Sequence, residues 1–288
     1  MPRRPDTPTR HGPGPGPGDE LSQADFERVR AMIHRHAGIA LNPGKRSMVL
    51  SRLSRRLRVL GRSDFCGYLD ELETGGCQLP EWQAFVNALT TNLTAFFREA
   101  HHFPVLAQHL RQRAALAPLQ LWCCAASTGE EPYSMAMTAL DCFDGQPPPL
   151  TILATDIDTA VLDKARRGVY ALEATARLDP SLRRRHFLRG RGASAGLARV
   201  QPQLGALISF RALNLLDARW PLPNRFDAIF CRNVMIYFDP PTQRRLLERL
   251  ARQLKPGGLL FAGHAENLSQ ARDLFEPQGQ TVYRLATA

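Results

Sequence analysis

The chain has 288 residues, of which 44% are hydrophobic, and a formal net charge of +10. This length fits one large domain, or a small domain joined to a medium one, with enough apolar residues for a packed core. No segment reaches the roughly 18 uninterrupted apolar residues that a membrane helix needs, and no apolar stretch of a secretory signal follows the first residues. We therefore expect a cytoplasmic protein that does not insert into a membrane, with a monomer as its default state.

The six cysteines indicate neither a disulfide framework nor a metal centre. They form no CxxC pair, and no cluster of cysteine and histidine has the spacing of a zinc site. We expect buried thiols in a reducing compartment. Cys123 and Cys124 are adjacent in an apolar run, so in a strand their side chains would point to opposite faces.

Positive charge is concentrated at the start of the chain. Residues 1–62 hold 13 Lys/Arg and 5 Asp/Glu, a net charge of +8, which leaves the remaining 226 residues nearly balanced at +2. Such asymmetry predicts an acidic partner, and the charge alone is compatible with nucleic acid, a membrane surface or an acidic protein. No interleaving of aromatic and basic residues supports nucleic acid, so we expect none.

Two segments of different composition precede the bulk of the chain. Residues 1–20 are rich in proline and glycine, and we expect them to form a disordered tail. Residues 21–90 have apolar residues at helical spacing and predict a small all-α domain. Its expected helix from Lys45 to Leu60 carries a basic stripe beside the apolar face, formed by Lys45, Arg52, Arg55 and Arg56.

Residues 91–288 have a different pattern, in which short apolar runs alternate with helical segments. This alternation predicts an α/β domain with a mainly parallel sheet and helices on both faces. The expected strands are 119–125, 150–155, 225–231, 257–263 and 281–285. The segment 187–210 is rich in glycine and arginine and interrupts the alternation, so we expect an inserted β-subdomain there.

Carboxylates follow the first two expected strands, where a doubly wound sheet binds its ligand. The first turn has a single glycine, Gly129, and then Glu130 and Glu131, which suit a cationic ligand better than a pyrophosphate. Asp156 ends the second strand, in the place of a ribose-binding carboxylate. The alternatives are ordinary N-terminal helix residues for the glutamates and a helix cap for Asp156.

Two further clusters complete the candidate site. We interpret Thr90–Glu99 as helical, which would put Thr94 and Arg98 on one face and Phe97 on a neighbouring one. Phe96 and Phe97 are expected in the core, and the alternative for Arg98 is a surface charge. After the third strand, Asn233 and Tyr237 are expected near the ligand. Val234 and Ile236, in the same segment, are expected in the core.

Six motifs, taken together, resemble the CheR family of chemotaxis receptor methyltransferases. The resemblance covers nearly the whole chain, from Leu21 to Leu285, and its motifs occur in order: TNLTAFFRE, STGEEPYS, ATDID, NLLD, FCRNVMIYFD and KPGGLLFAGHAE. The resemblance implies a Rossmann-like methyltransferase domain that depends on S-adenosylmethionine, contains a small inserted β-subdomain and follows an all-α domain. It also implies transfer of methyl groups to receptor glutamates, which yields glutamate methyl esters and S-adenosylhomocysteine.

The same resemblance implies roles for individual residues. Arg98 and Tyr237 would flank the methyl group and orient the incoming carboxylate, without a strong general base. The cofactor would be held by Asn92, Thr94, Arg98, Glu130, Asp156, Asn214, Leu215, Arg232 and Asn233. The basic stripe would dock the acidic helical methylation region of the receptor, and the insert would bind a receptor tail peptide as an added strand.

One departure from the family pattern precedes Ser127, where Ala125 and Ala126 replace a glycine and a small residue. Their Cβ atoms limit how closely the backbone can approach the cofactor, so we expect weaker cofactor binding at most. Two other functions remain open from the sequence: methylation of a protein outside chemotaxis, and a non-catalytic sensor or scaffold that binds the cofactor.

Overall fold

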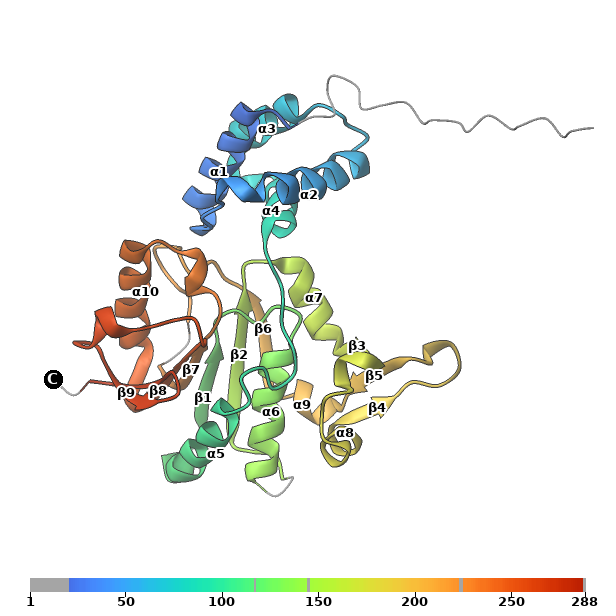
Figure 1. Cartoon of the computed structure of the whole chain (residues 1–288). Helices are drawn as coiled ribbons and strands as arrows, with labels where there is room; N and C mark the ends of the chain where they lie inside the picture. The colour runs from blue at the N-terminus through green and yellow to red at the C-terminus, as the bar shows by residue number, and fades with distance from the viewer. Residues whose placement is uncertain (1–20, 117, 144–145, 223–224, 287–288) are drawn as a thin grey trace, which may run out of the picture. The chain divides into compact units, whose positions relative to one another are not determined.

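The computed structural model describes residues 21–116, 118–143, 146–222 and 225–286 (Figure 1). The expected disordered tail, residues 1–20, lies outside this part of the chain. The described residues divide into two compact units, the first comprising 21–33 and 41–89 and the second 34–40 and the described part of 90–286. Within the described residues, no helix combines the length and the apolar character that crossing a membrane requires.

The first unit is the expected all-α bundle. Its first helix begins with a local cap, in which the Asp25 backbone N–H donates to Ser22 Oγ at 3.0 Å. Asp64 caps the third α-helix through the backbone N–H groups of Cys66 and Gly67. Fully buried apolar side chains such as Phe26, Leu53 and Phe85 fill the core. The elements are α1 (Gln23–Ala37), η1 (Pro43–Lys45), α2 (Arg46–Val59), α3 (Phe65–Gly75), η2 (Gly76–Gln78) and α4 (Pro80–Leu89).

The second unit is built on a seven-stranded sheet with the order β6-β2-β1-β7-β8-β10-β9. The five strands from β6 to β8 are parallel, and β10 pairs antiparallel with both β8 and β9. This sheet confirms the expected α/β class. The strands are β1 (Leu119–Cys123), β2 (Leu150–Asp156), β6 (Ile208–Ala212), β7 (Phe226–Cys231), β8 (Leu254–Ala262), β9 (Phe275–Gly279) and β10 (Val282–Leu285).

Helices cover both faces of this sheet. One core cluster joins the strands to α5 and α6, and the other joins them to α10 (Figure 1). Cys123 belongs to the first cluster and Cys124 to the second, so the two thiols face opposite sides as expected. The helices are α5 (His102–Arg113), η3 (Ala114–Leu116), α6 (Glu130–Cys142), α7 (Thr159–Arg167), η6 (Met235–Tyr237), α10 (Pro240–Gln253) and η7 (Ser269–Ala271).

A small antiparallel sheet is inserted between α7 and β6, and its boundaries differ from the expected segment 187–210. Its order is β3-β5-β4, so it already begins at Val169. Ile208, Ser209 and Phe210 instead pair with β2 in the main sheet, where β6 is an edge strand. The elements are β3 (Val169–Ala171), η4 (Leu172–Thr175), α8 (Pro180–His186), β4 (Phe187–Arg189), η5 (Gly192–Ser194), β5 (Leu197–Val200) and α9 (Pro202–Gly205).

Candidate functional site

The turn after β1 brings an acidic side chain to the carboxyl edge of the sheet. Gly129 has φ +100°, and a Cβ there would lie 2.8 Å from both Ala165 Cβ and Tyr170 Oη, so the turn requires glycine. Glu130 then opens α6, is only 6% exposed, and accepts a hydrogen bond from Thr128 Oγ1 at 2.6 Å. Its carboxylate therefore lies at this edge, as the sequence predicted.

Glu131 is used differently from its neighbour. Its Oε2 lies 2.9 Å from Arg232 Nη1, and its Oε1 accepts from the Cys123 thiol at 3.2 Å. Burial raises the pKa of Glu131 despite the nearby guanidinium. The expectation that both glutamates face a cationic ligand is therefore wrong for Glu131, which is held inside the protein.

Asp156 ends β2 and holds the turn after β1. Its two oxygens accept from the Ser127 and Asp158 backbone N–H groups at 2.8 and 2.9 Å. Burial raises the pKa of Asp156 to about 6. The cap of α7 is Asp158, which accepts from Ala160 and Val161, so Asp156 is not the helix cap that was its alternative role.

The segment 90–99 is extended and then turns, and the expected helix is wrong. Side-chain bonds to distant residues fix it: Asn92 Nδ2 and Thr90 Oγ1 both donate to Asp158 Oδ2, at 2.8 and 2.6 Å. The backbone N–H of Phe97, which has φ +51°, donates to Ser134 Oγ at 2.9 Å. We call residues 90–99 the Arg98 loop.

Within the Arg98 loop, Phe96 is buried in the core as expected, whereas Thr94 and Arg98 are half-buried. Arg98 Nη1 donates to the Leu93 carbonyl at 2.7 Å. In the part of the chain that the structure describes, no other hydrogen bond of the Arg98 guanidinium is formed. Most of its N–H groups can therefore serve a ligand.

The segment after β7 combines a buried cation with a strained turn. The Arg232 side chain is fully buried and contacts Glu99 and Glu131, so it does not point out into a ligand space. Asn233 has φ +56°, and its backbone N–H donates to Glu266 Oε2 at 2.9 Å. Sequence reasoning missed Glu266, which also accepts from the backbone N–H groups of Val234, Met235 and Gly263.

Tyr237 lies in η6 and is half-buried. Among the described residues, its hydroxyl forms no hydrogen bond. Val234 packs against the second core cluster, as expected. Ile236 is 49% exposed, so its expected place in the core is wrong.

Asn214 and Leu215 follow β6 and are engaged within the second unit. Asn214 Nδ2 donates to the His36 carbonyl at 2.7 Å, and its Oδ1 accepts from the Leu216 backbone at 2.9 Å. Leu215 is 7% exposed and packs in the core. An adenine in contact with these residues would therefore meet mainly backbone atoms rather than their side-chain ends.

The basic stripe of α2 is divided by internal pairing. Arg56 Nε donates to Glu81 Oε1 at 2.7 Å, and Arg52 Nη1 donates to the Ala88 carbonyl at 3.3 Å. Lys45 and Arg55 are exposed. The exposed cations of the stripe are therefore Lys45 and Arg55, while Arg56 stabilises the bundle.

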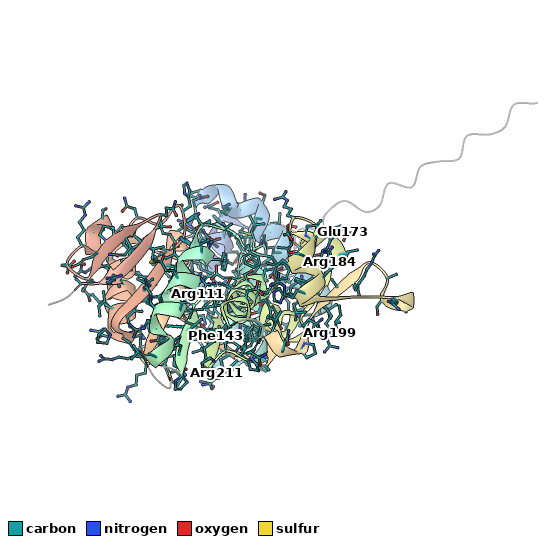
Figure 2. All side chains as sticks on the ribbon, turned by 90° about the horizontal axis from the view of Figure 1, so that it is seen from below. Arg111, Phe143, Glu173, Arg184, Arg199 and Arg211 are labelled. Carbon is teal, nitrogen blue, oxygen red and sulfur yellow. The ribbon has the colours of Figure 1, made fainter. Side chains whose placement is uncertain are left out.

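The inserted sheet and its flanking segments carry a second concentration of positive charge. Residues 166–211 contain ten arginines and two acidic residues. Arg184 and Arg199 lie on this part of the molecule, in α8 and β5 (Figure 2). Leu188 and Leu197 are 46% and 38% exposed on its strands.

One set of possible metal ligands occurs among the described residues. Glu99, His101 and His102 offer ligand atoms within 4.8 Å of one another. The Glu99 carboxylate, however, already pairs with Arg232 at 3.3 Å. Burial and Arg232 lower the pKa of His102 to about 4, and the same positive charge opposes a divalent cation.

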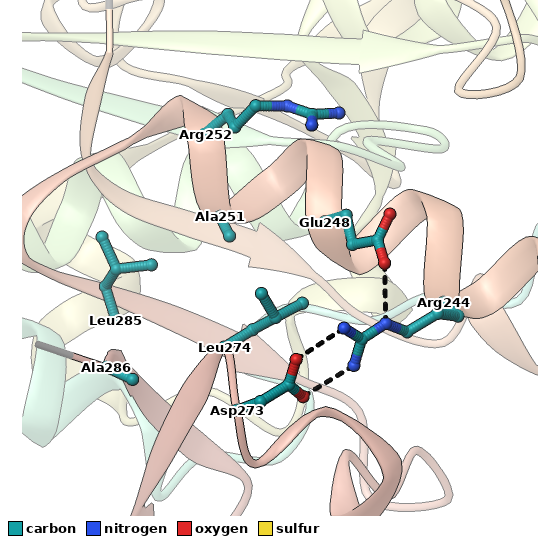
Figure 3. A pocket seen from close by; sticks show the side chains of 8 residues that line it. All are labelled: Arg244, Glu248, Ala251, Arg252, Asp273, Leu274, Leu285 and Ala286. Carbon is teal, nitrogen blue, oxygen red and sulfur yellow. Dashed lines mark hydrogen bonds and ion pairs between the residues drawn. The ribbon is translucent and has the colours of Figure 1, made fainter. Parts of the chain in front are cut away.

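A surface pocket lies away from these residues, beside α10 (Figure 3). Arg244 forms a bidentate pair with Asp273, at 2.7 and 2.6 Å, and its Nε donates to Glu248 at 2.8 Å. Ala251, Leu274 and Leu285 supply apolar lining. None of the residues expected to bind the cofactor lines it.

The chain matches both domains of one family. Residues 24–90 match the model "CheR methyltransferase, all-alpha domain", and residues 92–284 match "CheR methyltransferase, SAM binding domain". The chemotaxis protein methyltransferases of Klebsiella aerogenes and Escherichia coli K12 are 56% and 53% identical to this chain, each over 92% of it and over 90% and 92% of those proteins. Chemotaxis protein methyltransferase 2 of Pseudomonas aeruginosa is 52% identical over 91% of this chain and 93% of that protein.

Proposed function

Because this chain belongs to the CheR methyltransferase family, we propose that it methylates glutamate side chains of chemoreceptors. The products would be glutamate methyl esters and S-adenosylhomocysteine. One observation carries the proposal: Glu130 and Asp156 lie at the carboxyl edge of adjacent strands, with the Arg98 loop bonded to the same edge. Glutamate as the acceptor rests on the chemistry of Arg98 and on the relatives' role in chemotaxis.

The donor set fits S-adenosylmethionine. The carboxylate of Glu130 suits the ammonium of the methionine part. Asp156 accepts from the backbone N–H groups of Ser127, Asp158 and Ile157, and since a carboxylate has about four acceptor positions, a position remains for a ribose hydroxyl. When bound, the cofactor supplies an electrophilic methyl group on a sulfonium.

The chain's own residues would then orient the acceptor. A glutamate carboxylate is ionised near neutral pH, so no strong general base is needed. Arg98 has guanidinium N–H groups available to hold one carboxylate oxygen, and the Tyr237 hydroxyl can donate a second bond. Their effect is to align carboxylate oxygen and methyl carbon at near-attack distance rather than to neutralise the nucleophile.

We further propose two contact surfaces for the receptor. Lys45 at the end of η1 and Arg55 on α2 would meet the acidic helical methylation region, because both are exposed and cationic. The inserted sheet would bind an acidic receptor tail peptide as an added strand on β3 or β4, its two edges. The excess of arginine there, with exposed Leu188 and Leu197, supports this second surface.

The test is transfer of labelled methyl groups from S-adenosylmethionine to receptor-containing membranes. Label that is released by mild alkali identifies a carboxyl methyl ester. We expect Arg98→Ala to lower kcat about 100-fold or more through lost orientation, and Tyr237→Phe to have a smaller effect.

Two results would contradict the proposal. Cofactor binding without any transfer would indicate a non-catalytic sensor, or a substrate outside chemotaxis if other proteins become labelled. No cofactor binding at all would remove its basis.

A further inference from the structure

The buried guanidinium of Arg232 connects three separate segments. Arg232 follows β7, and its Nη2 donates to the backbone carbonyl of Arg98. The same Nη2 lies 3.3 Å from Glu99 Oε2, and Nη1 lies 2.9 Å from Glu131 Oε2. One side chain thus joins β7, the Arg98 loop and the N-terminus of α6.

Both carboxylates in this cluster are oriented by a second contact. Glu131 Oε1 accepts from the Cys123 thiol at 3.2 Å, and Glu99 Oε1 accepts from Asn233 Nδ2 at 3.2 Å. Glu131 is the immediate neighbour of Glu130. The cluster therefore fixes the relative positions of Arg98, Glu130 and Asn233, which lie on three different elements.

The cluster is poorly arranged for stability alone. Within the described residues, Arg232 Nε and Nη1 and Glu99 Oε2 are buried without a hydrogen bond, so the contact of Nη1 with Glu131 is an ion pair by distance only. A buried ion pair with incomplete hydrogen bonding contributes little net stability, because desolvation opposes the attraction. Its place beside the reacting groups calls for another explanation.

We propose that Arg232 is a positioning residue for methyl transfer, whose buried side chain holds the Arg98 loop at a set distance from the start of α6. This inference rests on the proposed function, and it replaces the expectation that the Arg232 side chain lines the cofactor site. Methyl transfer is sensitive to such placement, because a displacement of about 1 Å can lower a rate about 100-fold.

A matched control lies at the other end of the same strand. Asp227, near the amino end of β7, pairs with Arg113 Nε at 3.0 Å and with Lys255 Nζ at 2.7 Å. Arg113→Lys also replaces a guanidinium that pairs with a buried carboxylate, but it lies at the opposite edge of the sheet. We expect this control variant to keep the kcat of the wild type.

The experiment compares Arg232→Lys with Arg113→Lys in the full chain. Lysine keeps the charge but has a single nitrogen, whereas Arg232 contacts the Arg98 carbonyl and Glu99 through Nη2 and Glu131 through Nη1. We expect kcat to fall about 10- to 100-fold in Arg232→Lys, while the S-adenosylmethionine KM and the affinity for S-adenosylhomocysteine change little. Equal kcat in the two variants would overturn the proposal, and so would a loss of cofactor affinity that matches the loss of rate.

A double variant separates positioning from folding. Arg232→Gln alone leaves two buried carboxylates without a cation and is expected to lower the melting temperature. Adding Glu131→Gln removes one of these charges and should recover much of the lost stability. If kcat stays low after stability returns, Arg232 positions the loop; if kcat returns with stability, the proposal is wrong. Failure of the wild type to form an alkali-labile ester would instead refute the proposed function.

Discussion

The two ends of β7 hold ionic clusters of similar composition but opposite character. At the amino end, Asp227 accepts from Arg113, Lys255 and the Gln120 backbone N–H. These partners lower the pKa of Asp227, although burial opposes ionisation. Every contact of this carboxylate is a well-formed hydrogen bond of 2.7 to 3.0 Å, and the cluster can act as a structural tie.

At the carboxyl end, charges are buried with less complete pairing. Glu131 is closer to Arg232 than Glu99 is, yet the pKa of Glu131 is raised and that of Glu99 is lowered. Burial raises the pKa of both carboxylates, and their side chains are similarly enclosed, with 11% of Glu131 and 14% of Glu99 exposed. Glu99 also accepts hydrogen bonds from the His264 backbone and from Asn233, which lower its pKa, whereas the Glu99 and Glu266 carboxylates raise the pKa of Glu131. The fully hydrogen-bonded cluster thus lies at the scaffold end of β7, whereas the incompletely paired cluster lies at the edge where we propose the cofactor site.

The pH dependence of stability should have opposite signs at the two edges of the sheet. The pKa of Asp156 at the carboxyl edge is raised to about 6, so its folded state holds a proton more tightly than the unfolded chain, where the pKa is about 3.9. Its stabilising contribution is complete below about pH 4 and is lost as the pH rises through about 6. Relative to wild type, Asp156→Asn should therefore gain about 3 kcal/mol between pH 4 and pH 7.

Asp227 provides the opposing case. Its pKa is lowered, so its contribution is present above the unfolded value of about 3.9 and is lost as the pH falls through the folded value. The difference in unfolding free energy between wild type and Asp227→Asn should stay nearly constant between about pH 5 and pH 7 and fall as the pH drops below about 4, whereas the Asp156 contribution grows as the pH falls. Urea unfolding of both variants at several pH values measures this, and parallel curves for the two would contradict the comparison.

The sequence predicted the framework of the fold because the apolar runs of β1, β2, β7 and β8 are buried strands with simple patterns. It misplaced the insert because β6 is a partly exposed edge strand whose pattern is weak. The short strand β3 was missed for a similar reason, since three residues carry too little periodicity.

The candidate site was predicted by residue type better than by conformation. Asp156 and Glu130 lie at the sheet edge because strand ends set their places. The Arg98 loop was expected to be helical, but Asp158 and Ser134 bind it from distant parts of the chain, and no local pattern encodes such bonds. Glu131 and Arg232 are 101 positions apart in the sequence, so no local pattern could predict their ion pair either.

Two glycines with positive φ allow a smaller test of the difference between the carboxyl and amino edges of the sheet. Gly129 lies at the carboxyl edge, where a Cβ would meet Ala165 and Tyr170 at 2.8 Å, whereas at Gly257 the nearest atom is the side-chain Nη1 of Arg113 at 3.1 Å. Gly129→Ala should cost about 2 kcal/mol and weaken cofactor binding, because the turn before Glu130 must shift. Gly257→Ala should cost about 1 kcal/mol without an effect on the cofactor. Thermal unfolding with and without S-adenosylhomocysteine measures both, and equal stabilisation of the two variants by the ligand would speak against a cofactor site at this turn.

Two neighbouring arginines on α2 show the same difference between a side chain held in an ion pair and one that is exposed. Arg56 is paired with Glu81, which also accepts from Tyr68 Oη at 2.8 Å, so Arg56→Ala should lower the melting temperature.

Arg55 is exposed and should be available for the acidic receptor. Arg55→Ala should leave the melting temperature unchanged and raise the receptor KM two- to threefold, as expected for the loss of a surface pair of about 0.5 kcal/mol. The increase should disappear at high salt, because screening weakens the wild-type contact as well. The opposite result would be a higher receptor KM in Arg56→Ala at unchanged stability, with no change in Arg55→Ala. Arg56 would then be the docking residue, and its ion pair with Glu81 would not mark it as a structural residue.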